Sequence, residues 1–191
     1  MIIFILLCFS IHICMDPGFI FKYCEEYRDH YHETELIERV EKDEKVEDYL
    51  TLWLYKYHAD RIFIIQYHNG SKDWQHGTMR FEKCLPNTIS MKSDYVNFNL
   101  TWLDIPFYLK EHDYFIGNIC ELKIIDQVLY NLLLQYNVGY LACIIIRDEY
   151  GDSIGIFGIT YPQKNIDMSI RHDKIHDYLL EDSKIIYEYI K

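Results

Sequence analysis

Residues 140–161 read YLACIIIRDEYGDSIGIFGITY, two apolar runs on either side of a short polar segment. Each run is rich in isoleucine and aromatic side chains, which favour strands. The intervening segment, residues 148–152, holds the aspartate and glycine residues typical of a tight turn. The stretch therefore predicts a β-hairpin within an antiparallel sheet. Gly155 and Gly158, in the second run, predict that a helix packs closely on that strand.

Helical patterns lie on both sides of this hairpin. Before it, apolar residues recur at helical spacing and predict an amphipathic helix over residues 122–136: Ile124, Ile125, Val128, Leu129 and Leu132. After it, residues 170–190 carry a second such stripe: Ile175, Leu179, Ser183, Ile186 and Ile190. We expect both helices to pack on the sheet.

Further upstream, three stretches are predicted to be strands, with a short helix opening at residues 104–106. The strands are RIFIIQYHNG (61–70), MRFEKCLPNTISMK (79–92) and DYFIGNIC (113–120). Asn69-Gly70 and Leu85-Pro86 are interpreted as structural turns and edges. The order of elements predicts an α+β fold, an antiparallel sheet with packed helices. It resembles a GAF/PAS-like sensor domain over residues 60–191, whose last two strands form such a hairpin after a helix.

Residues 24–59 predict a helical stalk in front of this domain. They contain no glycine or proline, and acidic residues are concentrated between Glu25 and Asp48. Near the end of the stretch, one apolar stripe has helical spacing: Val46, Tyr49, Leu50, Trp53 and Tyr57. We interpret the acidic part as a solvated helical face.

The chain opens with an apolar run that carries no charged side chain before Asp16. Residues 1–23 are interpreted as a membrane anchor, since the whole stretch is long enough to cross a bilayer as a helix. The anchor would be made by Ile2, Ile3, Phe4, Ile5, Leu6, Leu7, Phe9, Ile11 and Ile13. A cleaved signal peptide and a buried helix are the alternatives, although a basic region and a small-residue cleavage site are both missing.

Charge and motifs exclude several classes of function. The formal net charge of −11, without a basic patch, argues against nucleic-acid binding. The six cysteines form no CxxC pair, and His172 and His176 lack the glutamate of a zinc-protease motif, so neither metal nor other cofactor is expected. No nucleophile elbow, P-loop or dinucleotide fingerprint occurs. We predict no catalytic residues and no enzymatic activity.

Three stretches are similar to the holins of T-even-type phages. The sharpest is CLPNTISMKS (84–93), where the family carries Leu-Pro-Ser-Thr-Ile-Ser; the residues of this family-like motif are Leu85, Pro86, Asn87, Thr88, Ile89 and Ser90. Residues 16–42 are similar to the family's segment after its span, and residues 140–161 to its late hairpin. Cys143 falls on a family cysteine, but residues 162–191 hold no cysteine that could be its partner.

This resemblance implies a single-pass protein of the host inner membrane that forms lesions and times host-cell lysis. Its soluble domain would be periplasmic and under antiholin control, and its partners would be membrane lipid, further copies of itself and an antiholin-type protein. The alternative is a GAF/PAS-like sensor module, membrane-tethered or secreted, that binds a ligand or a protein without enzymatic activity. An enzyme built on the same scaffold is a third hypothesis.

Overall fold

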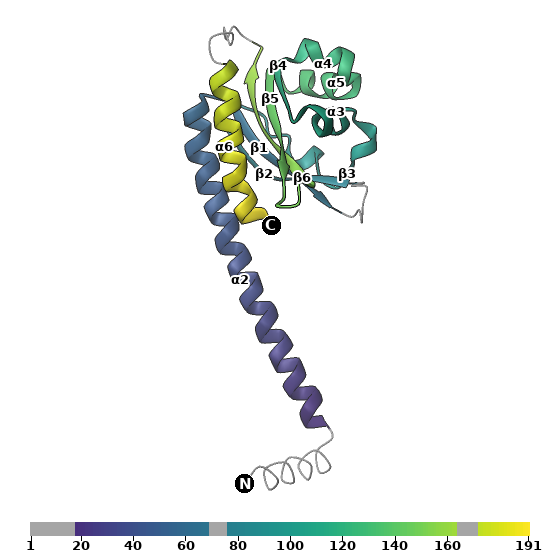
Figure 1. Ribbon diagram of the computed structural model, residues 1–191. Coiled ribbons are helices and arrows are strands. Elements are labelled where there is room, and N and C mark those ends of the chain that lie inside the picture. The colour runs from purple at the N-terminus through teal and green to yellow at the C-terminus, as the bar shows by residue number, and fades with distance from the viewer. Residues whose placement is uncertain (1–17, 69–75, 164–171) are drawn as a thin grey trace. The chain divides into compact units, whose positions relative to one another are not determined.

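The computed structural model describes residues 18–68, 76–163 and 172–191 (Figure 1). The chain divides into two compact units, residues 1–43 and 44–191. Helix α2 (Gly18–Tyr57) runs from one unit into the other. Within the first unit, Leu36, Ile37 and Val40 are all more than half exposed, in line with a solvated helical face.

Over the described residues, no helix combines the length and the apolar composition that crossing a bilayer requires. This finding overturns the predicted location as a single-pass protein of the host inner membrane. The predicted anchor residues, all within 2–13, lie outside the described residues, as does the Asn69-Gly70 turn.

The second unit is built on one six-stranded antiparallel sheet with the order β3-β2-β1-β6-β5-β4. Its strands are β1 (Arg61–His68), β2 (His76–Cys84), β3 (Phe98–Asn99), β4 (Tyr114–Asn118), β5 (Val138–Arg147) and β6 (Ser153–Pro162). The predicted hairpin is confirmed, because β5 pairs with β6 in a register that places Cys143 opposite Gly158. A turn closes it, with the Gly151 amide donating to the Asp148 carbonyl at 3.0 Å.

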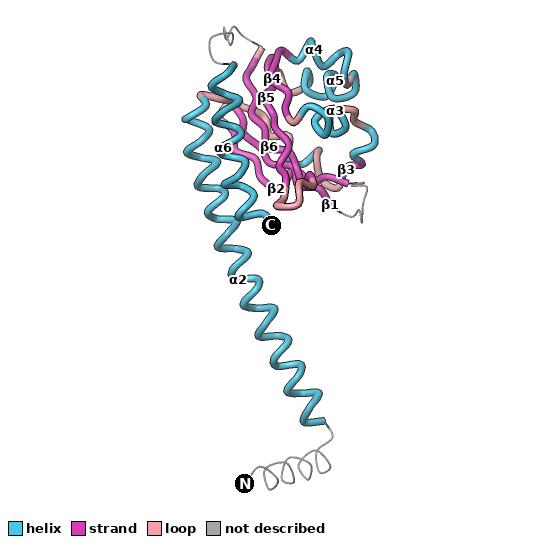
Figure 2. Tube along the Cα trace, viewed as in Figure 1, coloured by secondary structure: helices cyan, strands magenta, loops and turns pink. Residues whose placement is uncertain are grey.

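Helices cover both faces of this sheet (Figures 1 and 2). On one face lie the last turns of α2 and the helix α6 (His172–Ile190). On the other lie α3 (Ile105–His112), α4 (Ile119–Ile125), α5 (Gln127–Gln135) and the short 3-10 helices η1 (Lys92–Asp94) and η2 (Leu100–Trp102). Central strands are therefore buried on both sides, which explains why residues 141–146 form an unbroken apolar run.

The apolar stripe at the end of α2 belongs to this core. Val46, Leu50, Trp53, Leu54 and Tyr57 are buried there, together with Ile175, Leu179, Ile186 and Ile190 of α6. The predicted stalk over residues 24–59 is therefore not shown as one separate element, because its part from Glu44 onward belongs to the second unit. The predicted C-terminal helix is confirmed, and its stripe is buried as expected.

Asp126 divides the predicted helix 122–136 into α4 and α5. Its side chain is buried and accepts a hydrogen bond from the Leu129 amide at 2.8 Å, which caps α5. It also accepts from the amides of Asp104 and Ile105, at 2.8 and 2.9 Å, at the start of α3. The helix predicted over residues 122–136 is thus interrupted at Asp126, whose side chain caps α5. Ile124, which belongs to the predicted apolar stripe, is 94% exposed.

The two glycines of β6 have a different role from the predicted one. A Cβ atom at Gly158 would lie 2.4 Å from the Phe63 ring, and one at Gly155 would lie 2.3 Å from the Ile65 carbonyl oxygen. Both neighbours belong to β1, the strand next to β6 in the sheet. The glycines therefore accommodate a neighbouring strand rather than a helix.

Replacing Asp182 with alanine should strongly destabilise the contact between α2 and α6. The buried Asp182 carboxylate accepts from Lys56 Nζ at 2.9 Å and from the Tyr57 hydroxyl at 2.7 Å. Asp182→Ala leaves the buried Tyr57 hydroxyl unpaired, while the Lys56 side chain is 32% exposed and stays hydrated, so the free energy of unfolding should fall by about 1–3 kcal/mol in urea denaturation. Glu181→Ala, on the exposed side of the same helix, is the control and should change it by less than about 0.5 kcal/mol. If Asp182→Ala changed the free energy of unfolding as little as Glu181→Ala, the Asp182 contacts would contribute no stability.

Candidate functional site

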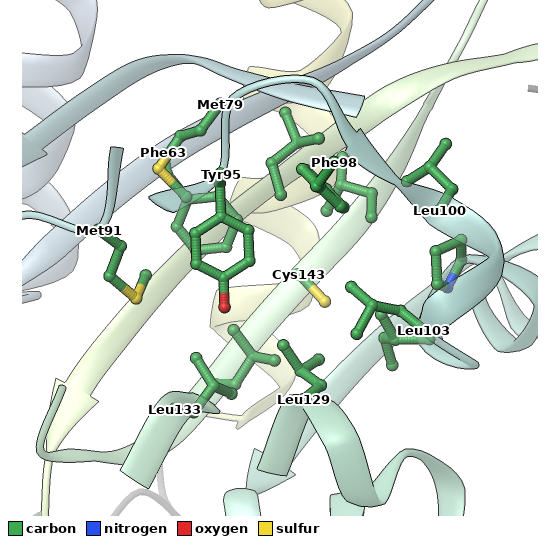
Figure 3. Close-up of a pocket in the computed structure, with 15 residues that line it drawn as sticks. Phe63, Met79, Met91, Tyr95, Phe98, Leu100, Leu103, Leu129, Leu133 and Cys143 are labelled. Atoms are coloured by element: carbon green, nitrogen blue, oxygen red, sulfur yellow. The ribbon is translucent and has the colours of Figure 1, made fainter. Parts of the chain in front are cut away.

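A small apolar cavity of about 40 Å³ lies between the sheet and the helices α3 and α5 (Figure 3). Its floor is made by side chains of β1, β2, β5 and β6: Phe63, Ile65, Met79, Leu141, Cys143 and Ile156. The covering segments contribute Met91, Tyr95, Phe98, Leu100, Leu103, Ile105, Pro106, Leu129 and Leu133. These floor residues alternate with those that face α2 and α6, so the pleat of the sheet decides which side chains reach the cavity.

Tyr95 brings the one hydroxyl group found in this lining. Tyr95 is 6% exposed, and its hydroxyl is buried in the wall of the cavity, on the side of Cys143, Leu129 and Leu133 in Figure 3. Within the described part of the chain, this hydroxyl has no hydrogen-bond partner. Burial raises the pKa of Tyr95 above its usual value, so the group is a neutral donor. An unpaired buried donor costs about 1–3 kcal/mol, which an acceptor placed in the cavity would recover.

Cys143 supplies the one thiol of this lining, from the middle of β5. Burial raises the pKa of its thiol to about 12, which keeps it neutral at physiological pH. A neutral thiol is a poor nucleophile and a poor metal ligand, so Cys143 acts as a small apolar side chain in this wall. Cys84, Cys120 and Cys143 are all free thiols.

A buried ion pair holds the segment that closes one side of the cavity. Arg61 on β1 and Glu82 on β2 have side chains that are 0% and 2% exposed, with Arg61 Nε 3.1 Å from Glu82 Oε1. The guanidinium also donates to the Ile89 carbonyl at 2.6 Å, while Glu82 accepts from the Met91 amide at 2.9 Å. Both partners therefore bind the segment 89–91 directly, and Met91 is placed over the cavity.

The predicted motif Leu85–Ser90 begins the closing segment, which is the stretch from Leu85 to Tyr95 that closes one side of the cavity. The Thr88 amide donates to the Leu85 carbonyl at 2.9 Å, so the motif begins with a turn, and Ser90 Oγ donates to the Glu82 carboxylate. Ile89 is exposed and contributes its carbonyl rather than its side chain. The motif positions the segment but lines no part of the cavity, and no three His, Cys, Asp or Glu residues of the described chain gather as a metal site.

Sequence reasoning did not find Tyr95 or Arg61. Arg61 carries one signal, a charged side chain at the start of an apolar strand run, which indicates that a buried partner is needed. Tyr95 carries none, since it is one of 18 tyrosines in a stretch without regular spacing.

Comparison with known proteins gives matches in structure only. No protein-family model matches the chain, and no curated protein matches it in sequence. The GAF-domain region of a Geobacter sulfurreducens protein superposes with a TM-score of 0.59 at 11% identity, over 82% of this chain and 97% of that one. A GAF domain/HD domain protein from the same organism gives 0.57 at 12% identity, over 78% and 93% of the two chains. The GAF domain of PixJ from Thermosynechococcus elongatus, in its blue-light-absorbing form, gives 0.57 at 10% identity, over 79% and 88%.

Identities this low show the fold alone, which is similar to that of GAF domains. The resemblance to T-even-type phage holins is therefore wrong, because the similar structures are GAF-domain proteins and the described chain lacks a membrane-spanning helix. The predicted function in host-cell lysis rested on this resemblance and is not supported. The hexapeptide that suggested it is a turn held by the Arg61–Glu82 pair.

Breaking the Arg61–Glu82 pair should cost more than removing it altogether. Glu82→Met leaves a buried guanidinium without its counter-charge, so the free energy of unfolding should fall by about 3–5 kcal/mol. The double variant Arg61→Met/Glu82→Met removes both charges and should recover part of this loss. Urea denaturation of the two variants measures the difference. A double variant less stable than Glu82→Met would show that the guanidinium is stabilised by its other contacts, to Thr160 and Ile89.

Alkylation should distinguish the buried cysteine from the exposed one. At pH 8, iodoacetamide should modify Cys120, which is exposed on α4, long before Cys143, because the latter is buried and its raised pKa keeps it protonated. Peptide mass spectrometry over time gives both rates, and unfolding in urea should make them similar. Equal rates in the folded protein would contradict a closed cavity around Cys143.

Proposed function

We propose that the chain is a GAF-type sensor module that binds a small molecule in the cavity beneath Tyr95. The observation that carries the proposal is the unpartnered Tyr95 hydroxyl inside an otherwise apolar cavity. Such a donor lowers stability unless an acceptor meets it, and a bound ligand would provide that acceptor. The apolar walls would supply affinity by burial, as is usual for small-molecule sites.

The similarity of the fold to GAF domains of sensory proteins supports this proposal. The similar structures include a blue-light-absorbing form of PixJ and a far-red photoreceptor, which are sensory proteins by name. The cavity lining of this chain offers a neutral thiol and a neutral phenol and no pair of nucleophile and base. The proposal therefore involves binding without a chemical step.

A sensor also needs a route from the ligand to another part of the molecule. Arg61, which holds the closing segment, donates to Thr160 Oγ1 at 3.0 Å on β6. The next residue, Tyr161, donates through its hydroxyl to the Tyr57 carbonyl at 2.9 Å, at the end of α2. Asp182 of α6 accepts from the Tyr57 hydroxyl. Movement of the closing segment would thus reach α2 and α6 through three buried hydrogen bonds that are linked by covalent bonds, at Thr160-Tyr161 and within Tyr57.

Filling the cavity should abolish binding without unfolding the protein. Benzene is a suitable probe because it binds dry apolar cavities. At ten times its Kd it should stabilise the protein by about 1.4 kcal/mol, a rise in Tm of about 3–6 °C. Cys143→Leu replaces the sulfur atom with three carbon atoms, which fill the cavity, and should remove this rise.

Cys120→Leu makes the same change at an exposed position of α4 and should keep the full rise in Tm. Differential scanning calorimetry with and without benzene compares the three proteins. A wild-type Tm that benzene does not raise, or an equal rise in Cys143→Leu, would contradict binding in the cavity.

A further inference from the structure

A second hollow lies directly beside the cavity, on the outside of the domain. This outer groove has a volume of about 300 Å³ and is lined by Asp94, Tyr95, Phe98, Asn99, Trp102, Leu103, Val128, Leu132 and Tyr136. Three of these residues, Tyr95, Phe98 and Leu103, also line the cavity. The same side chains therefore form the wall between the two spaces.

The cavity alone is much smaller than the sites that hold ligands larger than a probe such as benzene. Small-molecule sites usually measure about 300–1,000 Å³, whereas the cavity measures about 40 Å³. Turning the Tyr95 and Phe98 rings aside would join the cavity to the groove and give a site of ordinary size. These rings pack edge to face, with centroids 5.4 Å apart, and such a contact contributes only about 0.5–1.5 kcal/mol.

We infer that the cavity and the outer groove form one site for a neutral, elongated and largely apolar molecule with one hydrogen-bond acceptor. This inference rests on the proposed function and specifies its ligand class. Tyr95, at the shared wall, donates to the acceptor of the ligand. The rest of the molecule lies along apolar side chains on either side of that wall.

The charges around the site exclude an anionic ligand. Among the described residues that line either space, the one charged side chain is Asp94, a carboxylate that accepts from the Tyr136 hydroxyl. Neither lining contains a lysine or an arginine, and the whole chain has a formal net charge of −11. A carboxylate or phosphate on the ligand would lose its hydration without gaining a counter-charge.

Trp102 marks the outer end of the site. Its side chain is 71% exposed in η2, which is unusual for so large an apolar group, and it lines the groove beside Asn99 and Val128. Exposed aromatic side chains at the edge of an apolar hollow are typical of binding surfaces. The indole ring would cover the end of the ligand that stays closest to solvent.

The test uses 1-decanol and decanoate, which have equal chain length but differ in charge. Isothermal titration calorimetry on the full chain at pH 7 should show binding of 1-decanol, with decanoate at least about tenfold weaker. Tyr95→Phe removes the donor and should weaken 1-decanol about fivefold. Trp102→Ala should weaken it by a similar factor, whereas Tyr150→Ala, at an exposed aromatic residue of the hairpin turn, should leave the Kd unchanged.

The outcomes separate this inference from the proposed function. Equal affinities for decanoate and 1-decanol, or an unchanged Kd in both Tyr95→Phe and Trp102→Ala, would overturn the inference. Binding of benzene without binding of 1-decanol would also overturn it, while the cavity remained a ligand site. If neither probe bound, the proposed function would fail as well.

Discussion

The buried ion pair between Arg61 and Glu82 determines where the segment over the cavity lies. Taking two charges out of water costs several kcal/mol per ion unless further hydrogen bonds satisfy them, and here those bonds come from Thr160, Ile89 and Met91. The pair thus fixes the segment 89–91 at its polar end. At the other end, the Tyr95 carbonyl accepts from the Met79 amide of β2 at 2.7 Å, so the backbone of the closing segment is held at both ends, and the Tyr95 ring lies in apolar packing.

The sheet separates two cores that share the same strands. On one face, Asp182 of α6 joins that helix to the end of α2. On the other face, α3 and α5 cover the cavity. Arg61, on β1, contacts β6 through Thr160, and the adjacent Tyr161 contacts the end of α2. A ligand that shifts the closing segment would therefore act on the opposite face through neighbouring residues rather than over a long distance.

Parts of the fold were predictable where the sequence carries one clear pattern. The hairpin of β5 and β6 and the stripe of α6 were predicted because one pattern dominates each stretch. The prediction failed where one side chain overrides the pattern, as Asp126 does when it caps α5 and ends the preceding helix. The resemblance to holins rested on a hexapeptide that forms a turn. Tyr95 was not predictable, because its role depends on Met79, Leu133 and Cys143, which lie far apart in the sequence.

A crystal structure under xenon pressure tests the central claim most directly, because xenon enters dry apolar cavities and polar, hydrated ones hold water instead. The account predicts one xenon atom between Tyr95, Leu133 and Cys143, with no water on the Tyr95 hydroxyl. An ordered water bonded to that hydroxyl, without xenon, would show that the donor is already satisfied. That result would contradict the account of an apolar ligand site.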